Sequence, residues 1–92
     1  MIQEGHLLAV FNSAHRVMKA EGLLKERGMP ILLLPAPRQV QTDCGLALRF
    51  AETDRVTIME ILEQNQLLPA FVCVLRNGAY VTIWQEHPDS IE

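Results

Sequence analysis

The sequence predicts an α+β fold, a ferredoxin-like βαββαβ split βαβ sandwich with an additional C-terminal hairpin strand. Short apolar runs alternate with two helical patterns in the order strand, helix, strand, strand, helix, strand. The dipeptide Asn77-Gly78, a strong hairpin signal, then joins the fourth strand to a fifth. In such a sheet the first and third strands lie side by side at the centre, run in opposite directions and have both helices on one face.

The first half of the chain supplies two strands and one helix. Residues 7–11 are a continuous apolar run, which is typical of a strand buried on both faces. Asn12 and Ser13 offer an N-cap, so we predict a helix over residues 14–27, where apolar positions return to one face until a glycine follows. Residues 30–35 form a second strand with prolines at its ends, where a strand tolerates them.

The second half supplies three strands and one helix. Residues 46–50 are predicted as the third strand, and Thr53 or Asp54 caps a second helix that ends near residue 65. The hairpin strands cover residues 71–75 and 80–84.

Tyr80 and Trp84 in the last strand share one face if the strand keeps its period of two. Three of the strands are apolar at nearly every position, although two helices cover one face of a sheet. We therefore expect a partner subunit on the open face or along the last strand, with the aromatic pair as a dimer seam. The alternative cover for this face is the tail, residues 85–92.

Length, charge and cysteine usage limit the class of protein. The 92 residues form one domain, residues 1–92, with a core over about 7–84 and a mobile tail. The net charge of -3 and the scattered cations argue against nucleic-acid binding, and no apolar run reaches the length of a membrane span. The start of the chain lacks the pattern of a signal peptide, and two cysteines are too few for a disulfide framework. We expect a reduced, cytoplasmic protein.

The sequence contains no motif that is typical of a metal or cofactor site. There is no C-x-x-C or H-x-x-x-H pair, no phosphate-binding glycine loop and no catalytic triad pattern. We expect no metal and no cofactor, and we favour a carrier or binding protein over a self-sufficient enzyme.

The polar segment 35–45 is the place where reactive chemistry is expected, because it holds Cys44 next to Gly45. Gly45 permits a backbone conformation that other residues disfavour, and Arg38 brings a permanent positive charge into the same loop. The predicted topology also brings this loop to the amino end of the first helix. The candidate binding residues there are Asn12, Ser13 and His15.

Helix amides and a cation stabilise a thiolate, so we expect Cys44 to be nucleophilic at neutral pH. Asp43 opposes that charge unless its side chain caps the turn, and His15 acts as a base or cation unless it points to solvent. The alternative is that Cys44 is a buried loop thiol. Cys73 lies inside an apolar strand and is expected to be an inert core thiol, although a redox pair with Cys44 stays open.

Four segments of the chain resemble a small bacterial family described as Se/S carrier protein-like, over roughly residues 7–84. They are Phe11-Asn12-Ser13, Glu21 with Leu23-Leu24-Lys25, Pro35-Ala36-Pro37-Arg38, and Cys44-Gly45-Leu46-Ala47-Leu48. The resemblance implies that the cysteine is prominent and that the protein carries sulfur or selenium.

Two functions follow as hypotheses. In the first, Cys44 accepts sulfur or selenium from a donor protein as a persulfide or selenosulfide and passes it to an acceptor protein. In the second, the loop is a binding or assembly module that recognises an anion or a protein partner through Arg38 and the helix amino end, and Cys44 only packs.

Overall fold

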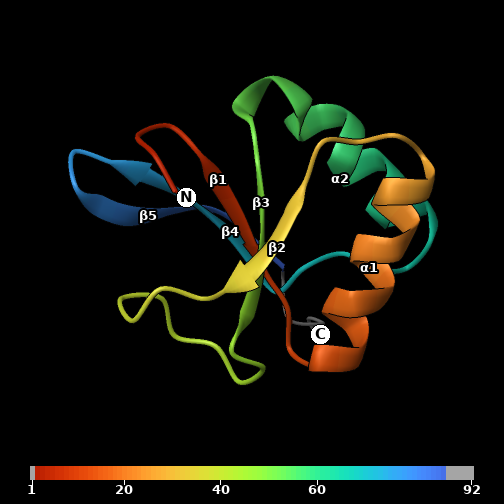
Figure 1. Cartoon of the computed structure of the whole chain (residues 1–92), viewed down its shortest axis with the longest axis horizontal. Coiled ribbons are helices and arrows are strands. Elements are labelled where there is room, and N and C mark those ends of the chain that lie inside the picture. The colour runs from red at the N-terminus through yellow and green to blue at the C-terminus, as the bar shows by residue number, and fades with distance from the viewer. Residues whose placement is uncertain (1, 87–92) are drawn as a thin grey trace, which may run out of the picture.

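A computed structural model describes residues 2–86 and shows an α+β fold with one five-stranded sheet and two helices (Figure 1). All seven predicted helices and strands are present, with ends that differ by two residues or fewer. From residue 87 onward the predicted mobile tail lies outside the described residues. The elements are β1 (Leu7–Val10), α1 (Ala14–Glu26), β2 (Leu32–Pro35), β3 (Leu46–Phe50), the short 3-10 helix η1 (Glu52–Asp54), α2 (Arg55–Gln64), β4 (Phe71–Arg76) and β5 (Ala79–Gln85).

The strand order is β2-β3-β1-β4-β5, and all neighbouring strands are antiparallel. The order differs from that of a simple split βαβ sheet because β5 is added beside β4. The prediction that the first and third strands pair in opposite directions is confirmed, since Val10 lies opposite Ala47 and Leu7 opposite Phe50. The end of β1 therefore lies beside the start of β3, and the loop before β3 reaches this edge of the sheet.

Local sequence signals explain how several elements begin and turn. The hydroxyl of Ser13 accepts a hydrogen bond from the amide of Arg16 at 3.1 Å and caps α1 as predicted. Asp54 occupies the N-cap position of α2 but makes no side-chain cap bond, because η1 leads directly into this helix. Asn77 and Gly78 have φ angles of 53° and 80°, which are the left-handed values that a tight hairpin turn requires.

Both faces of the sheet are buried. Alternate strand residues pack against α1 and α2, which lie together on one side of the sheet (Figure 1). The opposite face buries a second cluster, whose members are Leu8, Val10, Leu34, Val40, Ala47 and Cys73. No helix within residues 2–86 is both long and apolar enough to cross a membrane.

The loop between β2 and β3 covers the face opposite the helices. Val40, from the middle of this loop, is only 7% exposed and belongs to the same cluster as Leu8 and Val10. Ile2 and Ala36 also pack against this cluster. The expectation that this face lies open until a partner subunit or the tail covers it is therefore wrong. Val40, together with Ile2 and Ala36, provides cover that the strand pattern alone did not indicate.

The prediction that Tyr80 and Trp84 share a face is also wrong. Cys73 pairs with Thr82, whereas the preceding residue of β4, Val72, pairs with Trp84, so β5 has a bulge at this point. A bulge adds one residue to a strand and reverses the faces of the residues beyond it. Tyr80 consequently packs with the Val40 cluster, and Trp84 packs with the core on the helix side. The two aromatic side chains do not form one continuous seam.

The covering role of Val40 can be tested by truncating it to alanine. We expect Val40→Ala to lower the free energy of unfolding by about 1–2 kcal/mol, because two buried methyl groups are lost. Val56→Ala is the matched control, since Val56 is 70% exposed on α2. Its effect should be close to zero or slightly stabilising, because alanine favours the helix. Urea unfolding measures both values, and equal effects at the two positions would contradict the covering role.

Candidate functional site

The β2–β3 loop, residues 36–45, is closed at its base by a backbone hydrogen bond. The amide of Ala36 donates to the carbonyl of Gly45 at 2.9 Å, and a turn over residues 37–40 is closed by the amide of Val40. Gly45 has a φ angle of 73°, which confirms the predicted left-handed conformation after the cysteine. Cys44 is therefore held at the base of the loop, next to the first residue of β3, and not at its tip.

Cys44 is half-buried, and both hydrogen-bond donors and acceptors lie around its sulfur. The Thr42 hydroxyl lies at 3.3 Å from Sγ, and the Leu46 amide donates to Sγ at 3.4 Å. The thiol also lies within donating distance of the carbonyls of Leu46, at 3.3 Å, and Phe11, at 3.5 Å. Hydroxyl and amide groups can donate to a bare sulfur, whereas carbonyls can only accept its proton. Both protonation states of the thiol thus have hydrogen-bond partners.

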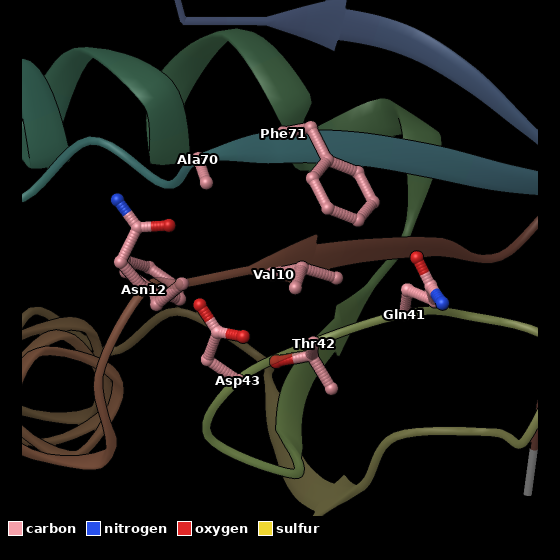
Figure 2. A pocket seen from close by; sticks show the side chains of 8 residues that line it. Val10, Asn12, Gln41, Thr42, Asp43, Ala70 and Phe71 are labelled. Atoms are coloured by element: carbon pink, nitrogen blue, oxygen red, sulfur yellow. The ribbon is translucent and has the colours of Figure 1, made fainter.

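A surface cavity of about 410 Å³ lies between the loop and the ends of β1 and β4 (Figure 2), and Cys44 is not among the residues that line it. Thr42 and Asp43, the two residues before Cys44, line it from the loop. Asn12 lines it from the segment between β1 and α1, as the predicted convergence of loop and helix entry requires. The residues that line the cavity are Val10, Phe11, Asn12, Gln41, Thr42, Asp43, Ala70 and Phe71.

The other predicted site residues lie further from the sulfur. The Ser13 hydroxyl is engaged in capping α1, and His15 is exposed in the first turn of that helix. Arg38 is exposed at the turn of the loop. Neither His15 nor Arg38 lines the cavity, and neither side chain forms a hydrogen bond or ion pair within residues 2–86. The sulfur contacts the carbonyl of Phe11, but within the described chain it contacts no amide of the first turn of α1.

Several residues that build the site were not predicted. Arg16 donates from Nη2 to the carbonyls of Gln66, at 3.3 Å, and Leu68, at 3.2 Å, and so fixes the segment before β4 against α1. The amide of Ala70 donates to the carbonyl of Val10 at 2.7 Å, which places the far wall of the cavity. These contacts join residues that are 50 to 60 positions apart in the sequence, so no local pattern predicts them.

One family model matches most of the chain. Residues 6–73 match the family model described as "Putative Se/S carrier protein-like". The chain belongs to this family. The match extends from the residue before β1 into β4, so it includes the complete loop and its cysteine, and it confirms the family predicted from the sequence. No curated protein and no solved structure matches the chain.

In this member of the Se/S carrier protein-like family, the second cysteine occupies a different environment. Cys73 is 2% exposed in the Val40 cluster, and burial raises the pKa of its thiol to about 11, as expected of a core thiol. Cys73 pairs with Leu8, three residues before Phe11, so about 10 Å along the strand separates it from the Cys44 sulfur. The two thiols also pack on opposite faces of the sheet, and a disulfide would need a rearranged backbone.

The chain brings together no metal site among its described residues, since no three His, Cys, Asp or Glu side chains are clustered there.

The different environments of the two thiols predict selective alkylation. Iodoacetamide at pH 8 should modify Cys44 in the folded protein and spare Cys73, because the raised pKa keeps the Cys73 thiol protonated until the pH approaches 11. Peptide mass spectrometry reads out the modified residue, and Cys44→Ser should abolish labelling of the folded chain. In urea both cysteines should react. Equal labelling of the two cysteines in the folded wild type would contradict this assignment.

Proposed function

We propose that this protein carries sulfur or selenium on Cys44, as a persulfide or selenosulfide that is taken from a donor and passed to an acceptor protein. The observation that supports this best is the position of Cys44, which is half-buried at the loop base with a hydroxyl and an amide within hydrogen-bond distance of its sulfur. The family description agrees with carriage in general and assigns no role to any residue.

The loading step conserves atoms and electrons. The Cys44 thiolate attacks the outer sulfur of a donor persulfide, R–S–SH, and forms a new S–S bond. The S–S bond of the donor breaks, its electron pair stays on the donor as the thiolate R–S⁻, and Cys44 becomes Cys44–S–SH. No net oxidation occurs, and a selenium atom follows the same route through R–S–SeH.

Hydrogen bonding around the sulfur is compatible with the loaded state. Once Sγ is bonded to a second sulfur it has no proton, so the carbonyls of Phe11 and Leu46 lose a donor. The Thr42 hydroxyl and the Leu46 amide keep an acceptor in either state.

A carrier fits the site better than an enzyme that completes a reaction alone. Within residues 2–86 the polar neighbours of Sγ are a hydroxyl, an amide and two carbonyls, and none of these is a base at neutral pH. Proton transfer and release of the atom would then depend on the donor and the acceptor. We propose cytoplasmic donors and acceptors, since the reduced thiols of the chain suit that compartment.

A binding or assembly module is the second candidate, and one observation favours it. Cys44 packs against the core on the helix side and already has internal hydrogen-bond partners, as a purely structural thiol would. In that case the exposed Arg38 at the turn of the loop contacts the anion or protein partner.

We also propose that the fold is ferredoxin-like. The β2-β3-β1-β4 part of the strand order and its antiparallel pairs support this assignment, with β5 as an addition.

Self-association remains a prediction, now through the edges of the sheet. Leu32 on β2 and Val81 on β5 are 42% and 40% exposed on strands whose outer backbone groups are available for pairing. We expect light scattering at micromolar concentration to give the mass of a homodimer or a larger assembly. The mass of a monomer at that concentration would contradict the prediction.

Sulfur transfer from a small persulfide tests the carrier directly. The wild type and Cys73→Ala should each gain the mass of one sulfur atom on the folded chain, and a reducing thiol should remove it. Cys44→Ser should gain none, while its unfolding transition stays close to that of the wild type, because serine keeps the local hydrogen bonds. If the folded wild type does not load, or if Cys44→Ser loads equally, the carrier proposal is wrong.

A further inference from the structure

We propose that Asn77 is a site of spontaneous deamidation, and that its conversion to aspartate or isoaspartate releases the N-terminal segment, residues 2–6, from the hairpin of β4 and β5. Deamidation here is the hydrolysis of the asparagine side-chain amide with the help of the following backbone nitrogen. The proposal goes beyond sulfur carriage and does not depend on Cys44.

The reaction consumes water and releases ammonia. The backbone nitrogen of Gly78 loses its proton and attacks the side-chain carbonyl carbon of Asn77, where a new C–N bond forms. The bond from this carbon to the side-chain nitrogen breaks, and ammonia leaves with that proton. Water then opens the resulting succinimide ring at either carbonyl and leaves aspartate or isoaspartate. No oxidant or reductant is needed, because no atom changes its oxidation state.

The surroundings of Gly78 leave this attack open. Both residues of the turn are exposed, and a Cβ atom at Gly78 would meet nothing within 4 Å. Since glycine has no side chain, its backbone nitrogen is little hindered. Within residues 2–86 neither the Gly78 amide nor the Asn77 side chain forms a hydrogen bond, so no contact holds the reacting groups apart.

The other two asparagines of the chain lack this combination. Asn12 precedes Ser13, whose side chain hinders the attacking nitrogen. Asn65 precedes Gln66, and its side-chain amide donates a hydrogen bond to the carbonyl of Ile61 at 2.8 Å. We therefore expect the reaction at Asn77 and not at these two positions.

The turn that contains Asn77 also holds the start of the chain. The Glu4 carboxylate accepts a hydrogen bond from the backbone amide of Asn77 at 2.7 Å. Beside it, the amide of Gly5 donates to the carbonyl of Leu75 at 2.8 Å, and the amide of Leu75 donates to the carbonyl of His6 at 3.1 Å. The segment before β1 is thus attached to the hairpin both at its turn and at β4 (Figure 1).

Either product of deamidation weakens this attachment. Aspartate at position 77 keeps the turn, because Asp-Gly suits the same hairpin as Asn-Gly, but it places a second carboxylate beside that of Glu4. Two like charges this close repel each other. Isoaspartate carries the chain through the side-chain carbonyl and adds a methylene carbon to the turn, so the Asn77 amide moves away from Glu4. The released segment includes Ile2, which packs against the Val40 cluster.

Ageing of the full chain tests the site. After incubation in mildly alkaline buffer, peptide mass spectrometry should find aspartate and isoaspartate at position 77, while Asn12 and Asn65 stay amides. A synthetic peptide of residues 75–80 is the reference, and the folded chain should convert within about tenfold of its rate, because an exposed turn opens at little cost. An Asn77 that stays intact while this peptide converts completely, or faster conversion of Asn12 or Asn65, overturns the proposal.

Hydrogen exchange of the Gly5 amide, followed by NMR, tests the release. In Asn77→Asp this amide should exchange at least about threefold faster than in the wild type at low salt, and added salt should reduce the difference. Asn12→Asp is the matched control, because it makes the same chemical change beyond the opposite end of β1. The control should leave the exchange rate of Gly5 unchanged.

A double variant assigns the effect to the two carboxylates. In a Glu4→Gln background, Asn77→Asp should change the Gly5 exchange rate by less than about twofold, since one charge of the repelling pair is absent. Equal exchange in the wild type and Asn77→Asp, or the same acceleration with and without Glu4, overturns the release of the segment. None of these measurements involves Cys44, so a failure of sulfur carriage and a failure of this proposal are distinguishable.

Discussion

Burial of Val40 in the cluster of Leu8 and Val10 fixes the β2–β3 loop against the face of the sheet opposite the helices. Since the loop base is also closed between Ala36 and Gly45, the few residues between Val40 and Cys44 have little freedom. These residues run past the end of β1, where the Cys44 sulfur lies 3.5 Å from the carbonyl oxygen of Phe11. A hydrophobic contact thus helps to fix the position of a thiol that it does not touch.

The two cysteines lie on opposite faces of the sheet and in different environments. Cys73 lies within a central region of the sheet, where neighbouring strands pair on both sides and burial raises its pKa. Cys44 comes just before the first residue of β3, where backbone groups and the Thr42 hydroxyl approach its sulfur. Both residues are thiols near β1, and they differ in burial and in hydrogen bonding: Cys73 is 2% exposed and lines a cavity of about 310 Å³ with Val40 and Tyr80, whereas Cys44 is half-buried among polar backbone groups.

Much of this fold was predictable because its signals are local. Apolar periodicity located the strands and helices, the Asn77-Gly78 pair located the hairpin, and the antiparallel pairing of β1 with β3 brought the loop to the start of α1. The features that were missed depend on contacts distant in sequence. Nothing near Val40 indicates that it covers a sheet face, and nothing near Trp84 indicates a bulge, which shows only in the pairing of β5 with β4.

The missed features change the physical account of the thiol. The sequence placed a cation, Arg38, and the helix amides near Cys44, an arrangement in which charge would activate the sulfur. The structure has Arg38 at the turn of the loop and a carboxylate, Asp43, in the cavity wall, so direct hydrogen bonds from Thr42 and Leu46 are the groups positioned to stabilise a bare sulfur. Hydrogen bonds act at contact distance, so the groups that can stabilise the sulfur are those that touch it and not a cation elsewhere in the loop.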